Sequence, residues 1–545
     1  MVFRHFILDF WKVVPVIVFL LFVTPIFIVL SSLFGEYSEN WSHIYEYVLS
    51  EYLVNSLILV LGVSFFVLII GVITAWLVSN YDFTGKNIFE WALILPLAIP
   101  PYILAYTFTG LFDSYGSANN LVRNIFFLEN DFIFFPNVRN IYGAILVLSF
   151  TLYPYVYLAS RMAFINQSTS LLDVGRTLGL NRISVFLKLG IPLIRPAIIG
   201  GLLLVIMETL SDFGAVEHFA VATFTTGIFR TWYGMYDLAT AMQLASVLLL
   251  FILVILALER YSRKKAAYTP SSSSFKALKK QQLKGYKNLL AILVCFLPIF
   301  IGFLLPVSEL INWTLSYKLD FFDSKFMKDF FNTIFLSLTT ALFCCFLAFL
   351  ITFSIRLRGT NLLYVLNSFL SLGYGVPGLI LAVGILQFFT FLDRSFFAYF
   401  PSFVLTGSIL GLILAYLIKA YALANNSIES GFLRVNKSFD DVSKTLGNSG
   451  FKLLGRVHFP LLRTSFLTAF LLVFAEVIKE LPATLILRPF NFDTLAVSAY
   501  IYASEERMYE AAAPSIAIVL AGLLPIIILS RIIRDSRPGS QKNEG

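Results

Sequence analysis

Four carboxylates at matching places along the chain are the side chains best suited to handling an ion. Glu208 and Asp212 stand four residues apart near the end of one apolar run, and Glu476 and Glu480 repeat that spacing near the end of another. Residues four apart lie on one face of a helix, and acids at membrane depth usually face a cavity or a partner. Carboxylate oxygens are hard donors, which a trivalent metal ion prefers. We therefore predict that these four residues line a pathway for a cation.

Two other interpretations of the same acids stay open. They could be solvated residues at helix ends, or they could hold loops by hydrogen bonds. Lys479 lies beside Glu480 and three residues from Glu476, so the acids of that pair could be neutralised within their own segment. Glu217 and His218 follow the first pair, and we expect a structural role for both.

The chain carries no pattern typical of an enzyme. A Gly-x-x-x-x-Gly-Lys-[Ser/Thr] phosphate loop does not occur, since Gly85-Lys86 is followed by Asn87 and lacks the upstream glycine. Neither a His-Glu-x-x-His motif, nor a nucleophile elbow, nor a Cys/His cluster occurs. We expect no enzymatic activity and no cofactor bound by this chain. We also expect no stable metal site, because tight binding would oppose the release of a transported ion.

The composition places the chain in a membrane. Its 545 residues are 58% hydrophobic and only 13% charged, with a mean hydropathy of +0.82, which excludes a water-soluble globular domain. A helical span needs roughly 20 mainly apolar residues, and the runs here are too long for the strands of a membrane barrel. We predict about twelve spans, near 11–34, 53–79, 88–112, 141–165, 193–217, 238–258, 289–310, 330–355, 361–390, 403–425, 461–485 and 514–531.

Prolines and glycines interrupt the third predicted span of each half. Pro100-Pro101 does so in the first half, and Gly375, Pro377 and Gly378 do so in the second. Such breaks free backbone carbonyls, which protein or a water-filled cavity must satisfy. The breaks could line the transport route or simply kink the helices.

Loop charges predict the orientation of the spans. Lys and Arg accumulate in loops that stay in the cytoplasm. Residues 35–52 carry four Glu and no Lys or Arg, so we expect them outside, whereas residues 259–288 carry nine Lys and Arg against one Glu. Twelve spans then place both termini in the cytoplasm. The net charge of +8 reflects this bias and attraction to anionic lipid, so it needs no nucleic-acid partner.

One stretch of the amino-acid sequence occurs twice in similar form. DVGRTLGLNRISVFLKLGIP (173–192) aligns without a gap with DVSKTLGNSGFKLLGRVHFP (441–460), and the four acids keep the same repeat offset, which is the separation of Asp173 from Asp441. A parallel duplication of a six-span unit explains this, because an even number of spans returns the second copy in the same orientation. We therefore divide the chain into a first half (1–258), a basic cytoplasmic linker (259–288) and a second half (289–545).

Each copy predicts a rigid two-helix elbow. In the second copy Ser438 fits a helix N-cap, Asp441 the first turn and Gly447 the residue after the helix end. One face of that first helix is apolar in both copies, through Leu171, Val174 and Leu178 and through Phe439, Val442 and Leu446. The elbow could merely shield this stripe against its own half. Two copies in matching register favour a duplicated partner instead.

The elbow resembles the cytoplasmic EAA loop of ABC-importer permeases, whose pattern is Glu-Ala-Ala, three residues, Gly, nine residues and Ile-x-Leu-Pro. The acid, the glycine and the proline keep the family spacing in both copies, whereas the two alanines do not. In that family the loop is a coupling helix inserted into a groove on an ATP-binding subunit. The resemblance implies this role for loops 166–192 and 426–460, through Asp173, Gly179 and Pro192 and through Asp441, Gly447 and Pro460.

Two longer stretches, METLSDFGAVEHFAVATFTTGIFRTWYGM (207–235) and EVIKELPATLILRPFNFDTLAVSAYIYASEERMYEAAAP (476–514), resemble fused two-half permeases of bacterial ferric-iron importers. The similarity covers nearly the whole chain. It implies an all-α, type I ABC-importer permease fold in the bacterial inner membrane. The implied partners are two copies of an ATP-binding subunit, which use the ATP, and a periplasmic binding protein that delivers ferric iron for alternating access.

Alternative substrates and one alternative class stay open. Thiamine, polyamine and phosphonate importers have permeases of the same broad group. A major-facilitator-type secondary transporter also has six plus six spans, parallel halves and a basic linker. The repeated polar signature lies between the fourth and fifth spans of each half, as an ABC coupling loop does, and this favours the ATP-coupled class.

Overall fold

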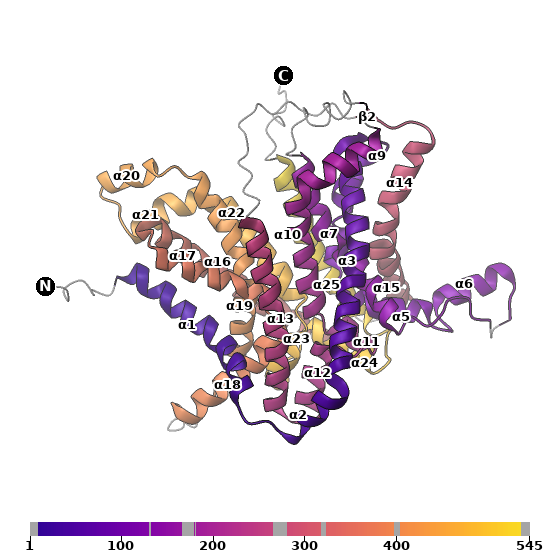
Figure 1. The fold of residues 1–545 in the computed structure, drawn as a ribbon, viewed down its shortest axis with the longest axis horizontal. Coiled ribbons are helices and arrows are strands. Elements are labelled where there is room, and N and C mark those ends of the chain that lie inside the picture. Colours follow the sequence, from indigo (N-terminus) through magenta and orange to yellow (C-terminus); the bar gives the residue numbers. More distant parts are fainter. Residues whose placement is uncertain are drawn as a thin grey trace.

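Long helices run side by side through most of the molecule (Figure 1). The computed structural model describes residues 9–129, 132–165, 179, 181–264, 281–317, 323–396 and 404–535. In this part of the chain, apart from one parallel pair of two-residue strands, β1 (Tyr81–Asp82) and β2 (Gln281–Gln282), the regular structure is helical.

The helices of the first half are α1 (Phe10–Ser31), α2 (Glu39–His43), α3 (Leu49–Asn80), α4 (Lys86–Ala92), α5 (Pro101–Phe112), α6 (Ser117–Phe126), α7 (Ile141–Ile165), α9 (Arg182–Val185), α10 (Ile191–Ser211), α11 (Gly214–His218), α12 (Phe224–Phe229) and α13 (Leu238–Lys264). Those of the second half are α14 (Tyr286–Ile299), α15 (Leu305–Ser316), α16 (Ser324–Arg358), α17 (Asn361–Leu370), α18 (Gly378–Ser395), α19 (Ile409–Arg434), α20 (Ser438–Thr445), α21 (Phe451–Leu453), α22 (Phe459–Ile478), α23 (Pro482–Leu487), α24 (Leu495–Ser504) and α25 (Ala512–Asp535).

The duplication seen in the sequence is also a duplication of structure. α7 and α19 begin at positions separated by the repeat offset, and so do α10 and α22. A π-helical turn precedes α10 at Phe186–Gly190, and another precedes α22 at the equivalent Leu454–His458. The repeat offset therefore relates equivalent elements across the elbow and the following span.

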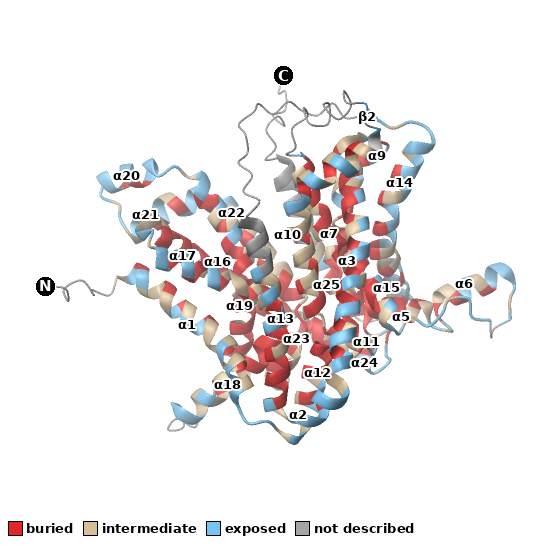
Figure 2. Ribbon diagram, in the orientation of Figure 1, coloured by how far each residue is buried: buried red, intermediate tan, exposed pale blue. Residues whose placement is uncertain are grey.

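The number of spans is close to the predicted number of about twelve. Among the described residues, ten helices are long and apolar enough to cross a membrane, or eleven if the bent pair counts as one span, and each of the ten overlaps one predicted span. The last predicted span is α25, whose apolar described part is Ala512–Ile528. Figure 2 shows buried residues concentrated where these helices meet, and exposed residues along α6, α14 and α20.

The remaining predicted span, 88–112, is bent rather than straight. The segments Lys86–Ala98 and Pro101–Phe126 meet at 90°. The bend lies at Pro100-Pro101, because proline lacks the backbone N–H of a continuing helix and disfavours helical geometry in the residue before it. The equivalent run of the second half is also broken, since α18 begins at Gly378 after the 3₁₀ turn Ser371–Gly375.

The first helix of each half packs against the opposite half. α1 lies against α16, α17 and α18, whereas α14 packs on α3 and α4. The chain just before α14 is fastened to the first half, because Leu283 donates its backbone N–H to the carbonyl of Asp82 at 2.9 Å and the backbone N–H of Thr84 donates to Asn288 Oδ1 at 3.0 Å. The two halves are therefore interlocked.

Candidate functional site

A half-open cavity lined by several charged side chains lies between the two halves. Its volume is about 80 Å³, and its walls come from α5, α7 and α10 of the first half and from α19, α22 and α23 of the second. All four predicted pathway acids line it. Two lysines, Lys419 and Lys479, line it with them.

The two acids of the first half are held without a lysine. Glu208 accepts a hydrogen bond of 2.9 Å from the hydroxyl of Tyr374, which belongs to the second half. Asp212 Oδ1 accepts the backbone N–H groups of Ala215 and Val216, each at 3.1 Å, and thereby caps the start of α11. The alternative role of holding a loop therefore applies to Asp212 in addition to its place in the cavity.

The two acids of the second half form ion pairs. Lys479 lies 2.9 Å from Glu476, as the spacing in the sequence allowed. Glu480 pairs with Lys419 of α19 and also accepts the backbone N–H of Ala483 at 3.3 Å. Lys419 was missed by sequence reasoning, although a lysine inside the apolar run ILAYLIKAYALA was a signal that could have found it.

These acids do not form a closed metal cage. In the part of the chain that the structure describes, no group of three or more His, Cys, Asp or Glu side chains is placed to hold a metal ion. The cavity is lined instead by four carboxylates and two ammonium groups.

One of the two helix breaks contributes directly to the cavity wall. Pro100 and Pro101 line it, so the first break borders the candidate route rather than only bending a helix. The second break lies against it, since a Cβ added at Gly378 would stand 2.5 Å from Glu480 Oε1. Glycine at this position allows Glu480 to approach the start of α18.

A second close approach gives a testable prediction at Gly214, which also lines the cavity. A Cβ added there would meet Tyr102 Cβ at 2.7 Å and Leu481 Cδ2 at 2.9 Å, and Tyr102 Cβ, which is bonded directly to the backbone of α5, cannot move away by a change of rotamer. We expect Gly214→Ala to destabilise the protein by ~1–3 kcal/mol through overpacking. Thermal unfolding in detergent measures this. Gly234→Ala, where the added Cβ has open space, serves as the control, and equal melting temperatures for the two variants would contradict the expectation.

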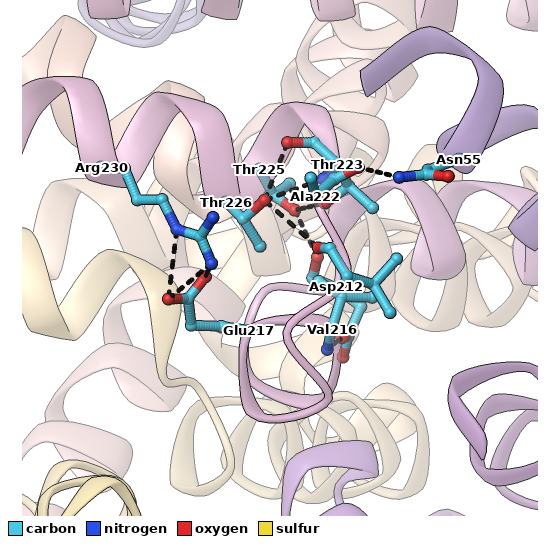
Figure 3. Close-up of polar contacts among 10 residues, drawn as sticks. Asn55, Asp212, Val216, Glu217, Ala222, Thr223, Thr225, Thr226 and Arg230 are labelled. Carbon is cyan, nitrogen blue, oxygen red and sulfur yellow. Dashed lines mark hydrogen bonds and ion pairs between the residues drawn. The ribbon is translucent and has the colours of Figure 1, made fainter. Parts of the chain in front are cut away.

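A network of hydrogen bonds fixes the loop beyond Asp212 (Figure 3). The hydroxyl of Thr225 donates to the backbone carbonyl of Asp212 at 2.7 Å, and Asn55 reaches across from α3 to the carbonyl of Ala222 at 2.9 Å. Glu217 pairs with Arg230 at 3.0 Å, in agreement with a structural role. His218 Nε2 similarly lies 2.9 Å from the hydroxyl of Thr109.

The predicted elbow of the second half is present, and Gly447 follows the end of its first helix, as predicted. α20 ends in a Schellman motif, in which Gly447 donates to the carbonyl of Lys444 at 3.0 Å and Asn448 to that of Ser443 at 2.9 Å. Gly447 has φ +78° and Gly179, its equivalent, has φ +73°. Both glycines therefore adopt the left-handed conformation, which at Gly447 ends α20.

The other predicted loop residues fall into three groups. Pro192 and Pro460 lie in the first turn of α10 and of α22, where proline is tolerated. Asp173 lies outside the described residues. The prediction that Ser438 caps its helix is wrong, because its side chain makes no cap bond and Asn436 Oδ1 accepts the N–H of Ser438 instead, at 3.1 Å.

The acid that anchors the elbow is Asp440, not Asp441. Asp441 is 76% exposed and lies 3.7 Å from Lys444. Asp440 is buried and pairs with Arg356 at 2.6 Å, and its Oδ1 lies 2.9 Å from Nε2 of His458. Sequence reasoning missed this anchor because its three members lie on α16, α20 and the π turn before α22, far apart along the chain.

The anchored helix presents its apolar stripe outward. Phe439, Val442 and Leu446 are 51%, 59% and 74% exposed, although each is a large hydrophobic residue. Within the described part of the chain the stripe of α20 is thus left largely exposed. The interpretation in which the elbow shields its stripe against its own half is not supported in the second half.

The amino-acid sequence matches the family of binding-protein-dependent transport system inner membrane components over residues 67–266 and again over residues 345–537. The chain belongs to this family. Each match contains one elbow and one pair of cavity acids, so this permease consists of two homologous halves fused in one chain. The family consists of inner-membrane transport components, and this chain is a multi-pass member of it.

Individual permeases of the family are similar to this chain over different lengths. It is 26% identical over 492 residues to the Fe(3+)-transport system permease protein FbpB 2 of Haemophilus influenzae, covering 89% of this chain and 90% of that protein. It is 23% identical over 470 residues to the ferric transport system permease protein FbpB of Actinobacillus pleuropneumoniae, covering 82% of this chain and 66% of that protein. It is 30% identical over 149 residues to the molybdenum transport system permease protein ModB of Escherichia coli, covering 27% of this chain and 62% of that protein.

Proposed function

We propose that this permease imports ferric iron, received from a periplasmic binding protein, by alternating access driven by two copies of an ATP-binding subunit. The observation that carries the ATP coupling is the exposed stripe of Phe439, Val442 and Leu446 on an otherwise anchored helix. Burial of a large apolar side chain contributes roughly 1.5–3 kcal/mol, so a stripe of three at the membrane surface supports a protein partner. The elbow of each half would receive one ATP-binding subunit.

A continuous rigid element connects the elbow to the cavity. The π turn Leu454–His458 leads directly into α22, which carries Glu476 near its other end. Over the 20 residues of α22 the chain rises about 30 Å. A tilt of α20 imposed by an ATP-binding subunit would therefore displace the cavity wall, as alternating access requires.

The charge of the cavity supports a cation as substrate. Four carboxylates face two lysines, and each lysine is already paired with a carboxylate. An oxyanion, such as the substrate of a molybdenum importer, would meet an excess of negative charge. The similarity to two ferric permeases, which extends over both halves, points to ferric iron among the multivalent cations.

The proposed orientation follows the loop charges and the positions of the elements. The acidic segment 35–52 contains α2, which lies at one end of the bundle in Figure 1, while α20 and β2 lie toward the other. We assign the end with α20 to the cytoplasm, together with both termini. Anionic lipid on that side and a binding protein on the α2 side complete the proposed partners, and nucleic acid is not among them.

Reconstitution into lipid vesicles tests this function. We expect the permease, assembled with its ATP-binding subunits, to hydrolyse ATP about tenfold faster when iron-loaded binding protein is added, which corresponds to about 1.4 kcal/mol of activation free energy. Radioactive iron should enter the vesicles in the same experiment. The iron-free binding protein is the control. Stimulation without iron entry would refute ferric iron as substrate, and iron entry without an ATP-binding subunit would refute the ATP-coupled class.

A further inference from the structure

The lysines of the cavity are distributed unevenly between the halves. Lys419 and Lys479 both belong to the second half, and each pairs with an acid of that half. At the repeat-equivalent positions, the first half has Thr151 in place of Lys419 and Ser211 in place of Lys479. Both of these uncharged residues also line the cavity. The duplication has therefore kept the acids in both halves and a positive partner in only one.

The part of the cavity wall that the first half contributes contains an unsatisfied hydroxyl. Tyr102 lines the same cavity, is only 4% exposed, and its hydroxyl makes no hydrogen bond with any residue that the structure describes. A buried hydroxyl without a partner costs roughly 1–3 kcal/mol. Its position in the cavity suits contact with a substrate or with water bound to it.

Charge balance indicates what this side of the cavity binds. Among the described ion pairs none includes Glu208 or Asp212, and their hydrogen-bond partners are the Tyr374 hydroxyl and two backbone N–H groups. Lys419 and Lys479 act on Glu208 only from beyond ion-pair distance. Acids inside a membrane protein require a positive partner or a proton. A passing cation meets that requirement in the first half, whereas in the second half the lysines already do.

We propose that the two halves of the permease have different functions in the cavity. Glu208, assisted by Asp212 and Tyr102, forms the side that contacts the multivalent cation, while Lys419 and Lys479 hold Glu480 and Glu476 as a neutral opposite wall. This inference rests on the proposed import of ferric iron and adds that only one half provides the contact.

Two pairs of variants with identical net charge test the inference. We expect Glu208→Gln to reduce iron uptake into vesicles at least tenfold. Glu476→Gln should also reduce uptake, because it leaves the Lys479 ammonium unpaired in the cavity. Adding Lys479→Met to each single variant removes one positive charge in both cases. We expect this second change to restore most of the uptake lost in Glu476→Gln and none of that lost in Glu208→Gln.

Each possible result decides the question. Rescue of both variants would show that only the net charge of the cavity matters, and rescue of neither would show that Glu476 is as necessary as Glu208; both results overturn the division of the halves. Full uptake by Glu208→Gln alone would overturn it as well. If the unaltered chain imports no iron although binding protein stimulates ATP hydrolysis, the proposed substrate fails, and the cation contact fails with it. The melting temperature of each variant, with the exposed Glu46→Gln outside the cavity as control, separates misfolding from loss of transport.

Discussion

Val442→Asp is expected to prevent an ATP-binding subunit from docking on the elbow of the second half while the chain still inserts into the membrane. Val442 lies at the middle of the exposed stripe of α20, between Phe439 and Leu446. The substitution removes roughly 1.5–3 kcal/mol of apolar burial and places a carboxylate without a partner in the interface. Since each 1.4 kcal/mol is tenfold in affinity, we expect binding at least ~100-fold weaker. Co-purification of the ATP-binding subunit in detergent measures this directly.

A matched control is available at the surface between α23 and α24. Phe490 is 94% exposed and just as apolar, but it belongs to neither elbow. Phe490→Asp should leave the association with the ATP-binding subunit unchanged. If Val442→Asp still binds the subunit as the unaltered chain does, the stripe is not the coupling surface and the proposed ATP coupling loses its main support.

Arg356→Met is expected to release the elbow from its own half. The Arg356 guanidinium donates to both carboxylate oxygens of Asp440, at 2.6 and 3.3 Å, and to the backbone carbonyls of Phe432, Val435 and Asn436 at 2.8 to 3.1 Å. Removing one member of a buried ion pair costs ~3–5 kcal/mol, because the other charge stays buried. We expect a lower melting temperature and a loss of ATP-driven uptake of at least tenfold. An elbow that is not fixed to its own half would pass little of the motion of the ATP-binding subunit on to α22.

Three further variants separate the anchor from general destabilisation. Arg358→Met, two residues along α16, removes a half-exposed ion pair with Asp9 and should cost at most ~1 kcal/mol. Arg356→Lys should restore only part of the function, because lysine lacks the planar fork that reaches five acceptors. Arg356→Met combined with Asp440→Leu should be less harmful than Arg356→Met alone, since no buried charge is left unpaired. Uptake equal to that of the unaltered chain in Arg356→Met would exclude a mechanical role for the anchor.

The choice of leucine at position 440 reproduces what the first half already has. Leu172 stands at the repeat-equivalent position, and Gly190 stands where the second half has His458. The buried ionic anchor therefore belongs to the second half alone in the sequence. Together with the uneven lysines of the cavity, this shows that the two halves have diverged both at the elbow and at the candidate route.

The amino-acid sequence by itself determined the features that depend on local and repeated patterns. Hydropathy along the chain predicts the spans because each helix must satisfy its own backbone in lipid. The constant repeat offset predicts the duplication, and Gly447 predicts a helix end because its conformation is a local property. The four acids also share one cavity, as their equivalent positions near the ends of α10 and α22 indicated.

Only the tertiary structure decided which charges meet. Lys419 lies some sixty residues before Glu480, and Arg356 lies more than eighty before Asp440, so their pairing depends on how α16, α19, α20 and α22 pack. The 90° bend at Pro100-Pro101 and the exchange of α1 and α14 between the halves depend on the same long-range packing. Proline marks a break in a helix, but the direction that the chain then takes is set by its neighbours. Pairing of distant charges carries no periodic signal in the sequence, and for that reason it was visible only in the folded chain.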